Sequence, residues 1–165
     1  MPSERIISIV FTSTAKNKMN SSQVVIIGYA CDEGVRRNNG RVGAKNGPYA
    51  IRKCIGNLPL RVVDKGNVVC KDGNLEKTQE ELGKMVAKEL ELGNFPLVIG
   101  GGHDLAYGHF LGINKVIKGT VGIINLDAHF DLRPFHNVGN SGTPFNQIGA
   151  LLKAQNKTFN YLPIG

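Results

Sequence analysis

The sequence predicts an α/β fold in which helices cover both faces of a mostly parallel β-sheet. Three stretches, residues 24–28, 97–100 and 121–126, are almost entirely apolar, which is typical of strands buried on both faces. They alternate with stretches of helical periodicity, of which residues 74–92 are the clearest. The 21 glycines cluster after the apolar runs, where strands turn into helices. In such sheets, functional sites form beyond the carboxyl ends of the strands.

The remaining elements follow in chain order. Further strands are expected at residues 61–63 and 68–70, around a turn at residues 65–66, and at residues 161–164. Helices are expected at residues 49–55 after Pro48, at 74–92 with Asn74 as the N-cap, at 105–117, and from near Phe145 to Ala154. Residues 31–48 contain too many Gly and Asn residues for regular structure, so we expect a long loop there.

The composition excludes several classes of protein. Hydrophobic residues make up 41% and charged residues 20% of the chain, which is typical of a globular domain rather than a disordered segment. No apolar run approaches the roughly 18 residues of a membrane span. The apolar run at residues 6–11 is too short and too poorly flanked for a signal peptide. We therefore expect a soluble cytoplasmic protein that does not contact a membrane.

The net charge of +7 raises the question of nucleic-acid binding. The basic residues are scattered, with no run of five or more, and tryptophan is absent. No nucleic-acid partner is therefore expected, and nucleic-acid binding is the weakest of the alternatives. The three cysteines, Cys31, Cys54 and Cys70, have no Cys-x-x-Cys spacing. We expect buried free thiols there, rather than disulfides or a structural zinc site.

Two of the predicted strands end directly in polar motifs. Residues 97–100 lead into Gly-Gly-His-Asp at residues 101–104, and residues 121–126 lead into Asp-Ala-His-Phe-Asp at residues 127–131. The segment between the two strands has the length of a right-handed βαβ crossover, which predicts neighbouring parallel strands. Both motifs are then expected at the same edge of the sheet.

The residue types in these motifs indicate a metal site. In an extended segment, alternation places Asp127, His129 and Asp131 on one side, where the carboxylates would repel each other without a cation. Mixed Asp and His ligation suits Mn²⁺ or a related divalent ion, and a pair of ions about 3.5 to 4 Å apart can activate a water for hydrolysis. The glycines before His103 allow the sharp turn that brings this residue close. Asp104 is expected either to support the site or to cap the following helix.

These motifs resemble those of the ureohydrolases, the arginase and agmatinase family. Further segments resemble its formimidoylglutamase branch, and the resemblance runs from about Val24 to Gly165: residues 31–44, the Gly-Pro pair at 47–48, and residues 104–109, 131–134 and 140–145. The resemblance implies an arginase-like, three-layer α/β/α sandwich with a mostly parallel sheet. It also implies hydrolysis of N-formimidoyl-L-glutamate to L-glutamate and formamide, a step of histidine catabolism, with two Mn²⁺ ions per complete site.

The resemblance also assigns roles to individual residues. His103, Asp127, His129 and Asp131 match four of the family's six metal-ligand positions, and Asp131 is counted among the catalytic candidates. Ser141 is the second catalytic candidate, because it stands where arginase-like members place a proton-shuttling His, a departure that favours the formimidoyl branch. The substrate has two carboxylates, and the candidates for binding it are Arg36, Asn39, Arg41, Arg133, Asn140, Ser141 and Thr143. The alternative is that the arginines pair with surface or loop groups.

The family's other two ligands come from an Asp-x-Asp motif in a later strand, and this sequence contains no Asp or Glu after Asp131. We therefore expect residues 1–165 to be the N-terminal part of one arginase-like domain whose C-terminal part is absent. Such a chain is expected to be inactive alone and to expose a bare sheet edge, so that it self-associates or forms a homo-oligomer. The absent acidic ligands would also explain part of the positive charge. Two other functions remain open: hydrolysis of a guanidino substrate, and a non-catalytic metal-binding or assembly role.

Overall fold

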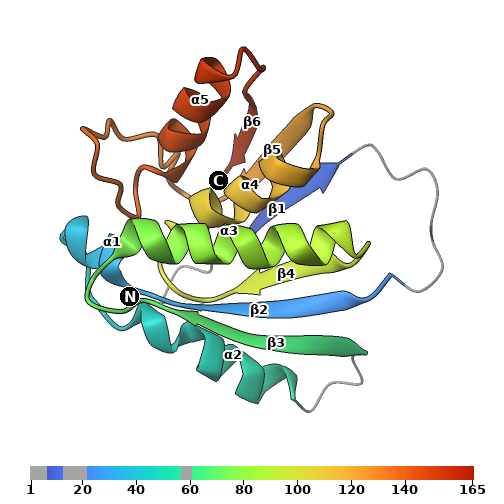
Figure 1. The fold of residues 1–165 in the computed structure, drawn as a ribbon. Helices are drawn as coiled ribbons and strands as arrows, with labels where there is room; N and C mark the ends of the chain where they lie inside the picture. The colour runs from blue at the N-terminus through green and yellow to red at the C-terminus, as the bar shows by residue number, and fades with distance from the viewer. Residues whose placement is uncertain (1–6, 13–21, 57–60) are drawn as a thin grey trace.

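The computed structural model describes residues 7–12, 22–56 and 61–165 and contains alternating strands and helices (Figure 1). The elements are β1 (Ile7–Thr12), β2 (Val24–Ala30), α1 (Glu33–Arg37), the 3-10 helix η1 (Ala44–Asn46), α2 (Gly47–Ile55), β3 (Val62–Val69), α3 (Leu75–Glu91), β4 (Phe95–Ile99), α4 (Leu105–Val116), β5 (Val121–Leu126), α5 (Pro144–Ala154) and β6 (Asn160–Ile164). The α/β class predicted from the sequence is confirmed.

β2 is the centre of the first sheet and lies parallel to both β3 and β4. Its residues after Val24 are all buried, because α3 and α2 both pack against it. Burial of an entire strand requires cover on both faces, so the layers around β2 are helix, sheet and helix. The expected three-layer arrangement is present in this part of the molecule.

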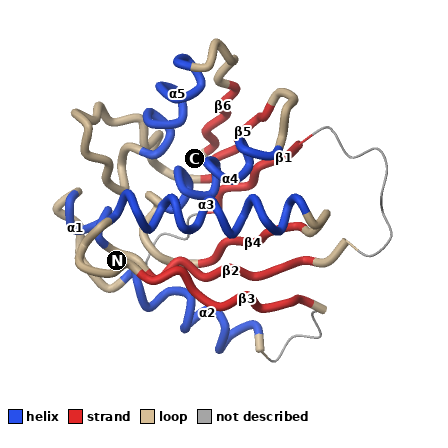
Figure 2. The backbone as a smooth tube through the Cα atoms, viewed as in Figure 1, coloured by secondary structure: helices blue, strands red, loops and turns tan. Residues whose placement is uncertain are grey.

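β5 is the centre of a second sheet, in which β6 is parallel and β1 is antiparallel to it (Figure 2). Helix α5 packs against α4, and Ile148 and Leu152 of α5 join the same core as Ile123 of β5. The other face of this sheet is more open, because Leu162 and Ile164 of β6 are 55% and 50% exposed. The sheets are mostly parallel, as expected, but an apolar face beside β6 stays accessible.

Helix α3 follows the sequence prediction closely. Asn74 caps its start by accepting a hydrogen bond from the backbone nitrogen of Lys77 at 3.0 Å. Its buried residues line up against α4, where a side chain at Gly112 would collide with the Gly83 carbonyl. The glycines that weaken the helical pattern of α4 therefore allow two helices to approach closely.

Three local predictions were wrong. β3 is one continuous strand, and residues 65–66 form an irregularity in its register against β2, with Gly66 at φ 80°. The expected loop at residues 31–48 contains α1 and η1. Among the cysteines, Cys31 is buried as expected, but Cys54 is exposed.

The prediction that the two motif-bearing strands are neighbours was also wrong. In the described part of the chain, β4 pairs with β2, whereas β5 pairs with β1 and β6. The intervening α4 therefore links two different sheets. The apolar run near the N-terminus forms β1, an edge strand that the sequence patterns did not predict. No helix in the described ranges is long and apolar enough to cross a bilayer.

Candidate metal centre

The turn after β4 brings His103 into the interior. Gly100 and Gly101 have φ values of 73° and 82°, a conformation that L-residues with side chains rarely adopt, and a side chain at Gly101 would overlap the Tyr29 carbonyl. The chain can therefore reverse directly after the strand. His103 is only 7% exposed at the end of this turn. The position of its ring depends on the glycines that the sequence places before it.

Asp104 supports this turn and does not cap helix α4. Its carboxylate accepts a hydrogen bond from the Tyr29 hydroxyl at 2.8 Å and makes no side-chain cap hydrogen bond to the helix. The residue is fully buried, and burial raises the pKa of its carboxyl to about 6, although the Tyr29 hydrogen bond opposes this shift. Of the two roles expected for Asp104, the structure favours support of the site.

The second motif is a turn and not an extended segment, which corrects the alternation argument made from the sequence. Residues 127–129 form a bend, in which Asp127 Oδ1 accepts a hydrogen bond from the backbone nitrogen of His129 at 2.9 Å. Asp131 has a φ of 44°, in the left-handed region. This conformation, rather than strand alternation, orients the Asp131 carboxylate.

The two turns converge on a cluster of three potential ligands. His103 Nδ1 lies 2.5 Å from Asp131 Oδ2 and 3.2 Å from Asp127 Oδ2, and one ligand atom from each of the three residues lies within 4.8 Å of the others. The cluster is shielded from solvent, since the side chains of Asp127 and Asp131 are 2% and 13% exposed. Motifs from two different sheets therefore meet at one point.

One atom of this cluster indicates what the site is suited to hold. Asp127 Oδ2 is buried and accepts no hydrogen bond in the described structure, although it lies near His103 Nδ1. A buried carboxylate oxygen without a donor is costly, and a bound cation removes that cost. One imidazole and two carboxylates are a donor set that suits Mn²⁺ and similar divalent ions. The residues present therefore fit the metal implied by the sequence motifs.

His129, the fourth expected ligand, lies beside the cluster. Its Nδ1 is 3.5 Å from Asp127 Oδ1, and its side chain is 61% exposed. It is not part of the three-residue group, whose atoms lie close enough to share one ion. The role of His129 as a ligand stays a prediction.

A loop beside the cluster joins two of the residues expected near the substrate. Arg133 donates to Asn38 Oδ1 at 2.8 Å, and Asn38 Nδ2 donates to the Ser141 hydroxyl at 3.1 Å. The backbone nitrogen of Arg133 also donates to the Gly142 carbonyl at 3.0 Å. Asn38, which the sequence patterns did not single out, connects the arginine to the serine.

The other expected substrate contacts are dispersed. Asn140 and Thr143 close their own turn, because the Asn140 backbone nitrogen donates to Thr143 Oγ1 at 2.9 Å. Arg36 forms a two-fold contact with Glu33 at 2.6 and 2.7 Å. Asn39 and Arg41 are exposed in the loop after α1. The alternative that loop arginines pair with protein groups therefore holds for Arg36.

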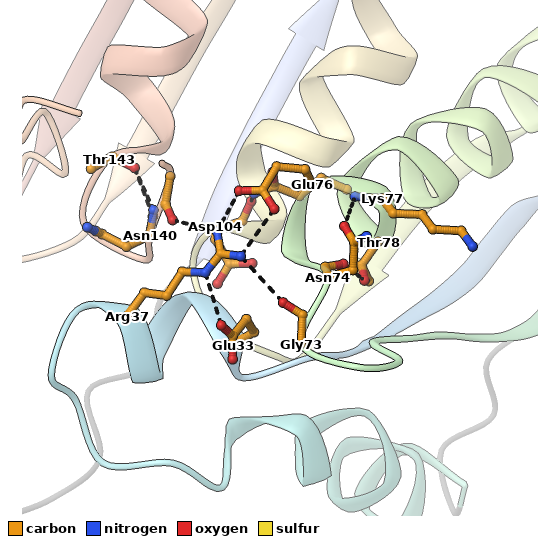
Figure 3. Close-up of polar contacts among 12 residues, drawn as sticks. Glu33, Arg37, Gly73, Asn74, Glu76, Lys77, Thr78, Asp104, Asn140 and Thr143 are labelled. Atoms are coloured by element: carbon orange, nitrogen blue, oxygen red, sulfur yellow. Dashed lines mark hydrogen bonds and ion pairs between the residues drawn. The ribbon is translucent and has the colours of Figure 1, made fainter. Parts of the chain in front are cut away.

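Arg37 is the main polar link between the loops on this side of the molecule (Figure 3). It donates to Glu33, to both carboxylate oxygens of Glu76 at the start of α3, and to the carbonyls of Gly73 and Gly139. These contacts join α1, α3 and the segment that precedes Asn140. Hydrogen bonds from Arg36, and then from Arg37, lower the pKa of Glu33 to about 2.

Comparison with known proteins identifies the family. The model of the arginase family matches residues 22–165, which include the cluster and the loops around it. The chain belongs to the arginase family. It is 49% identical over 147 residues to the formimidoylglutamase of Chromobacterium violaceum and 52% identical over 130 residues to that of Geobacillus thermodenitrificans. These matches cover 86% and 74% of this chain but 47% and 40% of the relatives, so the chain spans about half the length of the curated relatives it matches.

Solved structures agree with this assignment. The Mn²⁺-containing N114H variant of Trypanosoma cruzi formiminoglutamase has 34% identity and a TM-score of 0.69, over 81% of this chain and 49% of that one. The proclavaminate amidino hydrolase of Streptomyces clavuligerus has 25% identity and a TM-score of 0.69, over 87% and 51% of the two chains. The arginase-like fold of the described residues is confirmed.

Within this member of the arginase family, two polar residues that the motifs did not predict lie close to the ligand turns. Asn125 is fully buried in β5, and Tyr161 comes from β6. An Asn inside an otherwise apolar strand was a usable signal, because a buried amide needs partners. Nothing in the sequence around Tyr161 indicated its position. Burial, with the nearby Asp131 and Asp127 carboxylates, raises the pKa of its hydroxyl to about 12.

Proposed function

We propose that this chain provides part of the active site of a manganese-dependent formimidoylglutamase. The reaction is hydrolysis of N-formimidoyl-L-glutamate by one water to L-glutamate and formamide, within histidine catabolism in the cytoplasm. The observation that carries the proposal is the convergence of His103, Asp127 and Asp131, with one buried oxygen that lacks a donor. The identity to formimidoylglutamases over most of this chain supports the choice of substrate.

The chain's own residues have separate roles in this proposal. His103, Asp127, His129 and Asp131 hold the metal, and two Mn²⁺ ions in a complete site would supply a water activated for attack near neutral pH. Asp131 is proposed to act as both ligand and catalytic residue, a role supported by the short distance of 2.5 Å between its Oδ2 and Nδ1 of His103. Ser141 accepts a hydrogen bond from a neighbouring amide, so its own proton is available to a substrate group.

Arg133 and Ser141 are the strongest candidates for binding a substrate carboxylate. A shared contact with Asn38 holds them near one another, and Arg133 follows the proposed ligand Asp131 by two residues. An arginine fork and a hydroxyl together suit a carboxylate. Asn39, Arg41, Asn140 and Thr143 remain secondary candidates, and the pairing of Arg36 with Glu33 makes Arg36 the weakest.

We further propose that residues 1–165 form the N-terminal part of one arginase-like domain. The chain spans less than half the length of its curated relatives, and its ligand cluster is smaller than a two-metal site needs. The chain alone is then expected to have little or no hydrolase activity, even with added Mn²⁺. Its exposed apolar sheet face favours self-association.

A chimera tests the proposed function. In the Chromobacterium violaceum formimidoylglutamase, the segment that aligns with this chain is replaced by this chain's residues, and formamide and urea are measured with Mn²⁺ present. Formamide from formimidoylglutamate, lost when Asp131 is changed to Asn, is the expected result. A folded chimera that binds Mn²⁺ but releases no formamide would overturn the proposal.

A guanidino substrate is the second candidate function. It is favoured by the fold similarity to the amidino hydrolase and to the arginase of Bacillus subtilis, which has 28% identity and a TM-score of 0.63. Urea release from arginine or agmatine by the chimera, without formamide release from formimidoylglutamate, would establish it. Metal binding without either product would favour the non-catalytic alternative.

A further inference from the structure

One tyrosine on β6 holds the backbone of the second ligand turn. The Tyr161 hydroxyl donates to the Phe130 carbonyl at 2.8 Å and accepts a hydrogen bond from Asn125 Nδ2 at 3.0 Å. Asn125 Nδ2 also lies 3.3 Å from the His129 carbonyl, to which it donates. Two consecutive carbonyls just before Asp131 are therefore held by two neighbouring side chains.

The ring of the same tyrosine reaches the first ligand turn through a phenylalanine. Tyr161 stacks on Phe145, with ring centroids 4.5 Å apart and an interplanar angle of 29°. Phe145 in turn packs edge-to-face against the His103 ring, with centroids 5.4 Å apart. The backbone nitrogen of Phe145 donates to the Asp131 carbonyl at 3.3 Å. Tyr161 therefore contacts the second ligand turn directly and the first ligand turn through the side chain of Phe145.

Strand pairing alone does not fix the relative positions of the ligands in the cluster. β4 and β5 belong to different sheets in the described structure, so strand pairing does not fix the distance between His103 and Asp131. The left-handed backbone of Asp131 is also unfavourable without support from its surroundings. Contacts made by other residues must therefore set the relative positions of the ligands.

We propose that Tyr161 is a positioning residue for the metal cluster. Its hydroxyl holds the turn that ends in Asp131, and its ring holds His103 through Phe145. This role rests on the proposed metal-binding function, because it concerns the same cluster. Side chains that orient metal ligands typically change metal affinity about 10- to 100-fold when they are removed.

The test is the Tyr161→Phe variant, which keeps the ring and removes only the hydroxyl. Mn²⁺ affinity is measured in the chain and in the chimera by the loss of the EPR signal of free Mn²⁺. The visible spectrum of bound Co²⁺ reports the coordination geometry. The expected result is roughly a 10-fold or greater loss of affinity, together with an altered Co²⁺ spectrum. Tyr107→Phe is the matched control, because that hydroxyl makes no hydrogen bond to the described residues, and affinity is expected to be unchanged.

A second variant keeps the proposal falsifiable. Asn125→Leu removes the other donor to the same turn. In the double variant, the loss of Mn²⁺ binding free energy is expected to be smaller than the sum of the losses in the two single variants, because both side chains act on one segment. Urea unfolding without metal separates positioning from general stability. If Tyr161→Phe lowers the unfolding free energy but leaves affinity and spectrum unchanged, the residue is structural only and the inference is wrong.

The outcome also separates this inference from the proposed function. If neither the unmodified chain nor the chimera binds Mn²⁺, the proposed function fails, and the inference fails with it. If both bind Mn²⁺ and the chimera releases formamide, but Tyr161→Phe matches the Tyr107→Phe control, only the positioning role is overturned.

Discussion

Replacing Arg37 with Met should destabilise the fold far more than the same change at Arg36. Both arginines contact Glu33 from helix α1, and both are basic residues of its last turn. Arg36 is 64% exposed at its side chain and pairs within its own helix. Arg37 is 19% exposed and joins α1 to Glu76 and to two backbone carbonyls. The pair is therefore a matched test of local against long-range contacts.

The magnitude follows from the contacts that are lost. The bridge to Glu76, which is half-exposed, is worth about 0.2 to 1 kcal/mol. The bond to the nearly buried Glu33 is worth about 1 kcal/mol, because Arg36 continues to pair with this carboxylate. The two carbonyl contacts are long, at 3.3 and 3.4 Å, and add about 0.5 kcal/mol together. Arg37→Met should therefore cost about 2 kcal/mol, and Arg36→Met should cost less, because the exposed Arg36 side chain pairs only within its own helix.

Urea unfolding of the metal-free chain measures both losses. The pH dependence provides a second check, because the arginines lower the pKa of Glu33 from 4.5 to about 2 and also lower the pKa of Glu76. A lowered folded-state pKa contributes stability above the unfolded value, and that stability is lost as the pH falls through the folded value. The difference in unfolding free energy between the unmodified chain and Arg37→Met should therefore be largest above pH 4.5 and should decrease as the pH falls toward 2. Two results would refute the reasoning: equal losses of unfolding free energy for Arg36→Met and Arg37→Met, or a difference between the unmodified chain and Arg37→Met that increases as the pH falls.

Three further predictions concern the glycine turn, the metal cluster and the open sheet face. Gly102→Ala should cost about 1 to 3 kcal/mol in urea unfolding, because the added methyl would meet a buried carboxylate, whereas Gly122→Ala meets nothing within 4 Å and should change stability by less than about 0.5 kcal/mol. Saturating Mn²⁺ should raise the unfolding free energy of the unmodified chain, by about 2.7 kcal/mol at 100 times the dissociation constant, and Asp127→Asn should remove this increase. The control variant Asp72→Asn should keep the increase. An increase that persists in Asp127→Asn would exclude Asp127 as a ligand. Leu162→Lys should reduce concentration-dependent self-association in light scattering, and a mass that does not change with concentration in the unmodified chain would contradict the proposed role of this face.

The elements with strong periodicity were predictable from the sequence. Residues 121–126 coincide with β5, and α3 begins after the cap expected at Asn74. In both cases the local pattern and the tertiary burial favour the same structure, so nothing competes with the pattern. The motifs at the strand ends were also identified correctly as the place where His103, Asp127 and Asp131 meet.

The order of the strands was not predictable in the same way. A crossover of the right length indicates that two strands are parallel, but it does not show whether other strands lie between them. β1 is antiparallel to β5, and its short apolar run carried no sequence pattern from which an edge strand was predicted. Non-local pairing of this kind leaves little trace in a single sequence.

The conformation of the second motif was hidden for a different reason. Alternation predicts one face for Asp127, His129 and Asp131, and this holds only while the backbone stays extended. The left-handed φ of Asp131 and the bend at residues 127–129 break that condition. The ligands still converge, because the contacts that hold the turn come from β5 and β6 and not from the motif itself.

Burying the two carboxylates of the cluster is costly, and this cost connects the fold to the proposed function. Asp127 Oδ2 is buried and accepts no hydrogen bond from the described residues, and the carboxylate of Asp131 lies near the same nitrogen of His103. A buried carboxylate without full compensation destabilises the folded state. A divalent ion removes both the repulsion and the missing contact, so part of its binding free energy becomes folding free energy. The residues that constrain the two turns hold these carboxylates beside His103, which is the arrangement that a shared divalent ion requires.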